Sequence, residues 1–231
     1  MKRSEINRSV RWAEELCGKY HITLPDFARY APDKMRTVEG AGKNLVKVML
    51  GWDITDFGSG DFSRCGAVLF TVRNGSVYDP SVGTPYAEKY IFMKDGNEQE
   101  IPMHYHIHKT EDIINRAGGI LCVQVYANGT DGAPDRTKPV ILYRDGVRYE
   151  AKAGEVIEIT NGNSITLTPY VYHRFYAKTG SGDLIIGEVS KINDDNLDNV
   201  FAKPQKRFCP VEEDELPYRL LVNEYKEGGA L

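Results

Sequence analysis

Three of the five histidines in this 231-residue chain stand at alternate positions within residues 102–119. In an extended strand, side chains two residues apart point to the same face, so His104, His106 and His108 are expected to project together. Imidazoles placed side by side repel one another when protonated and lose hydration when buried, unless something uses their lone pairs. A divalent metal ion is the species that most naturally binds these imidazole lone pairs. The alternative is a solvent-facing strand on which histidines happen to alternate.

The residues after these histidines add a second pattern. His104 and His106 are followed by Glu111 and then Gly118, and this spacing resembles the first signature motif of the cupin barrels. The strand-like segment TLTPYVYHRFY supplies one further histidine, His173, as the second motif of that family would require. Because short histidine patterns also arise by chance, it is the spacing that favours a metal site.

The cupin resemblance implies a set of metal ligands. Three imidazoles and one carboxylate leave positions open on an octahedral ion, as a catalytic metal requires. Such a mixed set suits Mn, Fe, Co, Ni or Zn, and affinity alone does not choose among them. By alternation His108 is a rival ligand, but the motif spacing uses Glu111, and we expect His108 to line the site or the barrel mouth. The implied ligands are His104, His106, Glu111 and His173.

A closer resemblance runs through most of the chain. The segments MLGWDITDFGSGDF, LFTVRNG, KTEDIINRAGG and IIGEVSKINDDNLDN together look like the D-lyxose isomerase family of bacterial cupins. This resemblance implies an aldose–ketose isomerase that interconverts D-lyxose and D-xylulose, with D-mannose and D-fructose as secondary substrates. It also implies Mn²⁺ or a similar divalent ion as the cofactor, and a homodimer.

The chemistry of that reaction suggests catalytic residues. Moving hydrogen between C1 and C2 of a sugar requires a base and a group that stabilises the developing oxyanion. Lys109, next to the implied ligands, is the candidate for stabilising the oxyanion or donating a proton, and Glu188 and Glu212 are the candidate bases. We expect Lys89 to bind the sugar hydroxyls. For each of these four residues the alternative is an exposed side chain or a structural salt bridge.

Other functions stay open at this point. A non-haem dioxygenase also uses histidines and a carboxylate, and it would require iron and consume oxygen. A non-catalytic sugar-binding cupin would bind without turnover, although no helix-turn-helix pattern marks a regulator. The acidic residues Asp194, Asp195 and Asp198 have the composition of a calcium site but lack EF-hand spacing.

The elements that would position these residues are mostly strands. After about Leu45, runs of β-branched and aromatic residues alternate with turns that contain Gly, Asn and Asp. Regular short strands are typical of a sandwich or small barrel, and the resemblance specifies a mainly β, cupin-type barrel, that is, a double-stranded β-helix or jelly roll. Residues 52–62 are expected to form a structured loop on the barrel rim. The predicted strands are residues 67–75, 86–97, 99–108, 119–129, 138–146, 148–160, 164–177 and 183–192.

The first part of the chain predicts helices. From Ser4 to about Tyr20 the apolar residues recur with helical period, and Ser4 is the predicted N-cap. A short second helix is predicted near Pro25, with Pro32 closing it. The residues predicted to form the buried face of the first helix are Ile6, Val10, Ala13 and Cys17.

The composition is that of an ordinary globular protein. Hydrophobic residues make up 41%, charged residues 27%, and the net charge is −4, so neither a nucleic-acid surface nor a disordered tail is indicated. No signal peptide and no membrane span are expected. Four dispersed cysteines without a CxxC pair fit reduced thiols in a cytoplasm. We expect a single domain, 1–231, with a helical segment (1–44) packed on a barrel (45–200) and a C-terminal extension (201–231).

Overall fold

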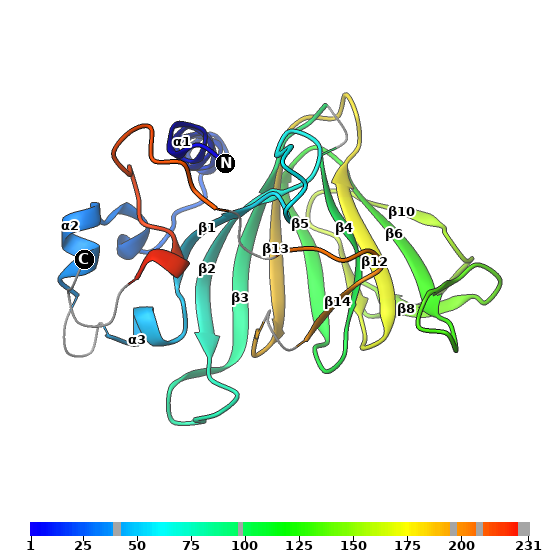
Figure 1. The fold of residues 1–231 in the computed structure, drawn as a ribbon. Helices are drawn as coiled ribbons and strands as arrows, with labels where there is room; N and C mark the ends of the chain where they lie inside the picture. Colours follow the sequence, from blue (N-terminus) through cyan, green and yellow to red (C-terminus); the bar gives the residue numbers. More distant parts are fainter. Residues whose placement is uncertain (39–42, 97–98, 195–197, 207–209, 226–231) are drawn as a thin grey trace.

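The computed structural model describes residues 1–38, 43–96, 99–194, 198–206 and 210–225. Two curved sheets face each other, and the helices lie at one end against the outside of the first strands (Figure 1). The helices are α1 (Arg3–Lys19), η1 (Asp26–Arg29), α2 (Pro32–Arg36), α3 (Lys43–Lys47) and η3 (Val222–Glu224). The strands are β1 (Gly51–Thr55), β2 (Ala67–Gly75), β3 (Gly83–Met93), β4 (Glu100–His106), β5 (Glu111–Gly118), β6 (Leu121–Asn128), β7 (Pro134–Asp135), β8 (Val140–Arg144), β9 (Val147–Ala151), β10 (Val156–Ile159), β11 (Ser164–Leu167), β12 (Val171–Ala177), β13 (Leu184–Lys191) and β14 (Asn199–Phe201).

The two sheets are built from antiparallel pairs. One sheet has the order β1-β2-β3-β13-β5-β11-β8-β9, and the other has the order β10-β6-β12-β4-β14, with β7 pairing β6. Strands that are consecutive in sequence often lie in different sheets, for example β4 and β5, so the chain winds between the two layers. The predicted fold class, mainly β with a cupin-type barrel of two facing sheets, is confirmed.

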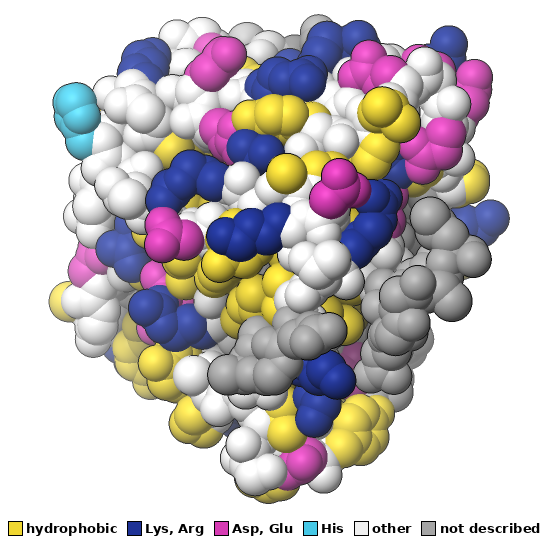
Figure 2. Space-filling model, turned by 90° about the vertical axis from the view of Figure 1, so that its left-hand side faces the viewer, with side chains coloured by type: hydrophobic (Ala, Val, Ile, Leu, Met, Phe, Trp, Pro, Cys, Tyr) yellow, Lys and Arg dark blue, Asp and Glu magenta, His cyan; other side chains and the backbone are white. Residues whose placement is uncertain are grey.

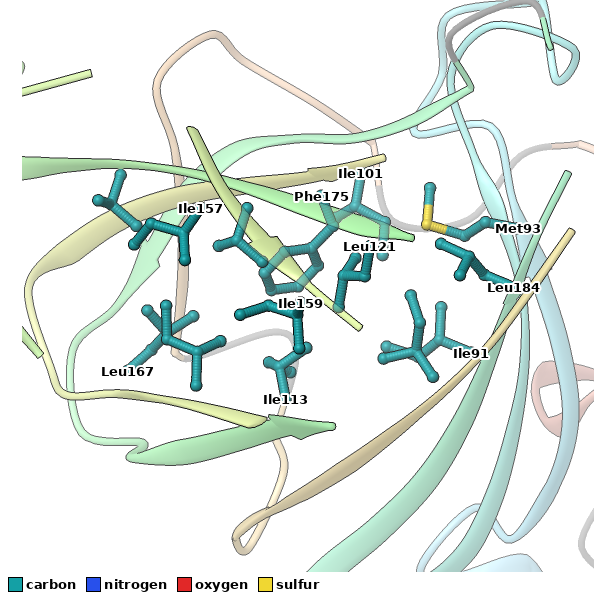
Figure 3. Packing of buried hydrophobic residues seen from close by; sticks show 14 of the residues in the cluster. Ile91, Met93, Ile101, Ile113, Leu121, Ile157, Ile159, Leu167, Phe175 and Leu184 are labelled. Atoms are coloured by element: carbon teal, nitrogen blue, oxygen red, sulfur yellow. The ribbon is translucent and has the colours of Figure 1, made fainter. Parts of the chain in front are cut away.

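The main hydrophobic core fills the space between the two sheets (Figure 3). Because side chains alternate along a strand, every second residue of each strand points inward. Ile113 from one sheet and Leu121 and Ile159 from the other are completely buried. Burying a side chain of this size contributes about 1.5–3 kcal/mol, so this core holds the two layers together.

A second core lies between α1 and the outer face of β1, β2 and β3. The predicted buried face of the first helix is confirmed, since Ile6, Val10, Ala13 and Cys17 are all at most 4% exposed. Beneath it, the Trp52 ring packs edge-on against Phe70 at 4.8 Å, and its Nε1 donates a hydrogen bond to the Ala28 carbonyl at 2.8 Å. The outer side of this end carries interspersed basic, acidic and hydrophobic side chains (Figure 2).

The C-terminal segment is tied to the start of α1. The buried guanidinium of Arg3 forms ion pairs with Glu213 and Glu224. Ser4 bonds Asp214 through both its backbone N–H and its hydroxyl, at 2.8 and 2.7 Å. Both ends of the described chain therefore meet on the helical side of the molecule. None of the helices in the described ranges has the length and apolar content needed to cross a bilayer.

Two predicted helix boundaries were wrong. The residue before α1 is Lys2, with extended backbone angles, so Ser4 lies within the first turn and bonds Asp214 instead of capping the helix. Pro32 does not close a second helix but begins α2. A proline fits this first position because its missing N–H would have no partner inside the helix.

Several strand boundaries also differ from the predictions. Residues 148–160 divide into β9 and β10 at a turn that includes Gly154 with φ +76°, and residues 164–177 divide into β11 and β12 around Pro169. Residues 52–62 are not all loop, because Gly51–Thr55 pairs with β2 as β1. The segment after the histidines, which was not predicted as a strand, is β5. The expected segment boundaries at 44/45 and 200/201 fall inside α3 and β14.

Candidate active site

Strand β4 carries the first two histidines into the barrel. His104 and His106 are 6% and 3% exposed, whereas Tyr105 between them faces outward, with its ring tilted against that of Tyr170 at a centroid distance of 5.6 Å. This alternation is the predicted one for His104 and His106, but the expectation that His108 projects together with them is wrong. His108 comes after the end of β4 and is exposed, so it lies at the mouth of the barrel and does not point inward.

Neighbouring strands bring the other two implied ligands to the same point. His173 on β12 lies directly opposite His104 in the strand register, and their Nε2 atoms are 3.1 Å apart. The Glu111 carboxylate, at the start of β5, approaches Nε2 of His173 at 3.1 Å and Nε2 of His106 at 3.3 Å. One nitrogen from each of the three histidines lies within 4.8 Å of the others. The four residues predicted as ligands therefore converge.

The hydrogen bonds of these side chains fit a metal ion. Nδ1 of His104 and Nδ1 of His173 lie 2.8 and 2.9 Å from the carbonyl oxygens of Pro102 and Val171, so each is assigned the N–H and each Nε2 is left with a lone pair. Within the described residues, His106 has no hydrogen-bond partner for either ring nitrogen, and neither has Oε1 of Glu111. Buried lone pairs that face one another are costly unless a cation sits among them. The donor set suits Mn, Fe, Co, Ni or Zn.

The charge states of these groups point the same way. Burial lowers the pKa of His104 well below its usual range, and His173 and His106 add to this effect. Burial and then Lys109 lower the pKa of His106. Burial alone would raise the pKa of Glu111, but Lys109 and His106 hold it well below its usual range. Neutral imidazoles beside an ionised carboxylate are the forms that bind metal.

A second group of charges lies beside the histidines. The Lys109 ammonium is 2.9 Å from Oε1 of Glu188, 3.0 Å from Oε2 of Glu111 and 3.2 Å from Oδ1 of Asn193. Lys89 lies opposite Glu188 in the register of β3 and β13, with its Nζ 3.6 Å from the same Oε1. Burial would raise the pKa of Glu188, but Lys109 and Lys89 lower it. Two lysines and two glutamates thus form a buried, charge-balanced network.

The two sheets contribute different chemistry to this site. The three imidazoles come from β4 and β12 of one sheet, whereas Glu111, Lys89 and Glu188 come from β5, β3 and β13 of the other. Between them is a small cavity of about 50 Å³. Its apolar lining includes Phe57 and Phe201, whose rings lie 5.6 Å apart.

The structure does not bring every predicted residue to this cavity. Glu212 is exposed, and its backbone pairs with Lys2 and Arg3 at the start of α1. The acidic run that contains Glu212 serves to hold the helix end, so the prediction of Glu212 as a base is corrected.

Sequence reasoning missed two residues near the site. Asn193 bonds Lys109, and Asp198 bonds the backbone that follows His106. In the sequence, Asp198 stands with Asp194 and Asp195 in an acidic loop with the composition of a calcium site, and Asp195 lies outside the described residues. Neither contact has a local sequence signal, because both depend on chain segments about 90 residues apart.

The chain is similar to known proteins over most of its length. A family model described as D-lyxose isomerase matches residues 1–225. A relative from Serratia proteamaculans called D-lyxose/D-mannose isomerase is 40% identical over 227 residues, covering 97% of this chain and 98% of the relative. A relative with the same name from Escherichia coli O157:H7 is 38% identical over 229 residues, covering 98% and 99%.

Solved structures with a similar fold are more distant in sequence. The L-ribose isomerase of Geodermatophilus obscurus has a TM-score of 0.56 at 15% identity, covering 92% of this chain and 98% of that one. The L-ribose isomerase of Acinetobacter sp. DL28, in complex with L-ribose, has a TM-score of 0.51 at 17% identity, covering 88% and 93%. At these identities the two structures support the fold alone.

Proposed function

The chain belongs to the D-lyxose isomerase family, and from that membership we propose that it is a metal-dependent aldose–ketose isomerase. The proposed substrates are D-lyxose and D-mannose, named for both relatives, with D-xylulose and D-fructose as the products. Mn²⁺ is the proposed ion. We further propose a homodimer in the cytoplasm.

One observation carries the metal dependence and the reaction together. The Nε2 atoms of His104 and His173 face each other at 3.1 Å, beside the Glu111 carboxylate. The buried Lys109–Glu188 pair lies next to them. An ion-binding group and a proton-transfer group in one cavity are what isomerisation of a hydroxy carbonyl compound requires.

In the proposed reaction, His104, His106, His173 and Glu111 would hold a divalent ion, and that ion would supply Lewis-acid polarisation of the sugar carbonyl. Glu188 removes the proton from C2, the carbon next to the aldehyde, and returns it to C1. The proton of the C2 hydroxyl passes to the C1 oxygen, so that the carbonyl moves from C1 to C2.

The depressed pKa of Glu188 keeps this carboxylate ionised at neutral pH, but it also makes Glu188 a weak base. The substrate carbon therefore has to be made acidic by its surroundings. Lys109 contributes to this, because its ammonium is held by three acceptors and supplies a fixed positive charge for the developing oxyanion. Lys89, on the far side of Glu188, is proposed to bind a hydroxyl of the sugar.

The proposed function is tested by measuring the conversion of D-lyxose to D-xylulose after the metal has been removed and single ions have been added back. Protein stripped with a chelator is supplied with single divalent ions under nitrogen, and D-xylulose is measured. We expect activity with Mn²⁺, none in the stripped protein and no consumption of oxygen in air. If the Mn²⁺ form leaves both D-lyxose and D-mannose unchanged, the proposed activity is wrong. Oxygen consumption that depends on Fe would instead favour a dioxygenase.

Two histidines provide a matched pair of variants. His104→Ala removes a buried imidazole from the centre, and we expect it to lose bound metal and activity together. His108→Ala removes an exposed imidazole four residues later and should keep both bound metal and activity.

The path of the hydrogen can be followed in D₂O. Proton transfer by Glu188 predicts that deuterium from the solvent appears at the carbon that receives the proton. A product without any deuterium at that carbon would favour a hydride shift between the two carbons.

A further inference from the structure

Asp198 holds the turn that follows the second predicted metal ligand. Its carboxylate accepts hydrogen bonds from the backbone N–H groups of His108 at 2.6 Å and Lys109 at 3.1 Å. Its carbonyl accepts a third from the N–H of Ile107 at 3.1 Å. The backbone N–H groups of the three residues after His106 thus all donate to Asp198, which is only 7% exposed. These bonds fix the Asp198 carboxylate in place.

The same carboxylate faces Nδ1 of His106, a ring nitrogen without a hydrogen-bond partner in the part of the chain that the structure describes. In His104 and His173, a backbone carbonyl accepts the Nδ1 proton and thereby directs Nε2 to the centre. His106 has no such bond among the described residues. Oδ2 of Asp198 lies 3.7 Å from Nδ1 of His106. That distance exceeds the upper limit of an N–H···O hydrogen bond by about 0.5 Å, so the two groups are neighbours that are not hydrogen-bonded in this structure.

We propose that Asp198 is a positioning residue for the metal centre: its carboxylate accepts the Nδ1 proton of His106 and so fixes the ring and tautomer that present Nε2 to the ion. This inference rests on the proposed function, in which His106 is a ligand. A carboxylate behind a ligating histidine typically strengthens metal binding 10–100-fold. A purely structural Asp198 would stabilise the turn and leave metal affinity unchanged.

The test compares Asp198→Asn with a matched control, Asp135→Asn. Asp135 also accepts two backbone amides, those of Thr137 and Lys138, at 2.8 and 3.1 Å, but no histidine faces it. The affinity for Mn²⁺ is measured by competition with a chelator, and the stability of each metal-free protein is measured by urea unfolding. We expect Asp198→Asn to bind Mn²⁺ about 10–100-fold more weakly, and Asp135→Asn to bind it as the wild type does.

Other results would overturn the inference. If Asp198→Asn loses stability but binds Mn²⁺ within about twofold of the wild type, Asp198 has only a structural role. If the wild type itself binds no divalent ion, the proposed function fails as well, so the two failures are distinguishable. If Asp198→Asn does not fold, ¹⁵N-histidine NMR of the Zn²⁺-loaded wild type decides. A slowly exchanging Nδ1–H on His106 supports the inference, and a rapidly exchanging one contradicts it.

Discussion

The most informative single substitution is Glu188→Gln, because it separates proton transfer from metal binding. Oε1 of Glu188 lies 2.9 Å from Lys109 and 3.6 Å from Lys89, and it accepts a hydrogen bond from Ser190 at 3.1 Å. Glutamine has nearly the same shape and keeps one acceptor oxygen, but it cannot take a proton from carbon. The substitution therefore changes the chemistry of the group with little change in packing.

Two magnitudes follow from this geometry. Loss of a general base lowers the rate about 10²–10⁴-fold, which corresponds to about 3–5 kcal/mol of activation free energy. Folding stability should fall by about 3 kcal/mol, because the buried network of Lys89 and Lys109 then contains one ionised carboxylate in place of two, while the Gln amide oxygen still accepts a hydrogen bond from Lys109. Metal content should not change, because the nearest predicted ligand, Glu111, keeps its contacts with His106 and His173.

The assay measures kcat for D-lyxose, metal content and urea unfolding on the same preparation. Glu158→Gln is the matched control: Glu158 forms an ion pair with Lys178 at 2.7 Å, but both side chains are 47% exposed. We expect unchanged kcat and a loss of at most about 1 kcal/mol for this control. The reasoning is refuted if Glu188→Gln keeps kcat within about threefold of the wild type, or if its loss of activity merely follows a loss of metal.

Two further predictions concern the scaffold. Gly118 has φ +98°, and a Cβ there would lie 1.9 Å from a backbone oxygen, so Gly118→Ala should lower the free energy of unfolding by at least about 3 kcal/mol. The control is Gly146→Ala, where φ is +79° but the space is open, and it should lose only about 1–2 kcal/mol. Equal losses of the two variants in urea unfolding would contradict the steric explanation. Arg3→Met should lose about 3 kcal/mol, the low end for a broken buried ion pair, because the Glu213 side chain is 57% exposed. The hydrogen bond from Arg3 lowers the pKa of Glu213, so the stabilisation from this ion pair is full above about pH 4.5 and is lost as the pH falls through the lower, folded-state pKa. The difference in unfolding free energy between wild type and Arg3→Met should therefore shrink from pH 5 to pH 3. A constant difference would show that the Arg3–Glu213 pair is not its source.

Much of the fold was predictable because hydrophobic alternation is strong in most strands. The predicted strand at residues 67–75 coincides with β2. Strand β5 was missed for the opposite reason: Glu111 and Asn115, two of its inward-facing residues, are polar, which disrupts the pattern of a buried face. Buried polar residues thus conceal the strand that carries them, and one of the two, Glu111, is a proposed metal ligand.

The site was predictable where its spacing is local. The spacing of His104, His106 and Glu111 reflects one strand, one turn and the start of the next strand, and all three lie at the centre. The contact between Lys109 and Glu188 could not be read from the sequence, because it depends on β13 lying between β3 and β5. Glu212 is a carboxylate, as a catalytic base requires, but it lies at the start of α1 and not at the cavity. No local sequence pattern distinguishes an acidic residue at a helix end from one that lines a cavity.

The division of the site between two sheets has a mechanical consequence. The imidazoles and the Glu111 carboxylate belong to two layers whose described strands do not pair with each other, so a bound ion would act as a cross-link between them. Any loosening of the layers would pull oxygen and nitrogen ligands apart. The spacing between the layers is set by core side chains such as Ile113 and Leu121, which are not part of the lining described for the site cavity (Figure 3). Metal affinity should therefore report the tightness of the core, and metal binding should in turn raise the temperature at which the two layers separate.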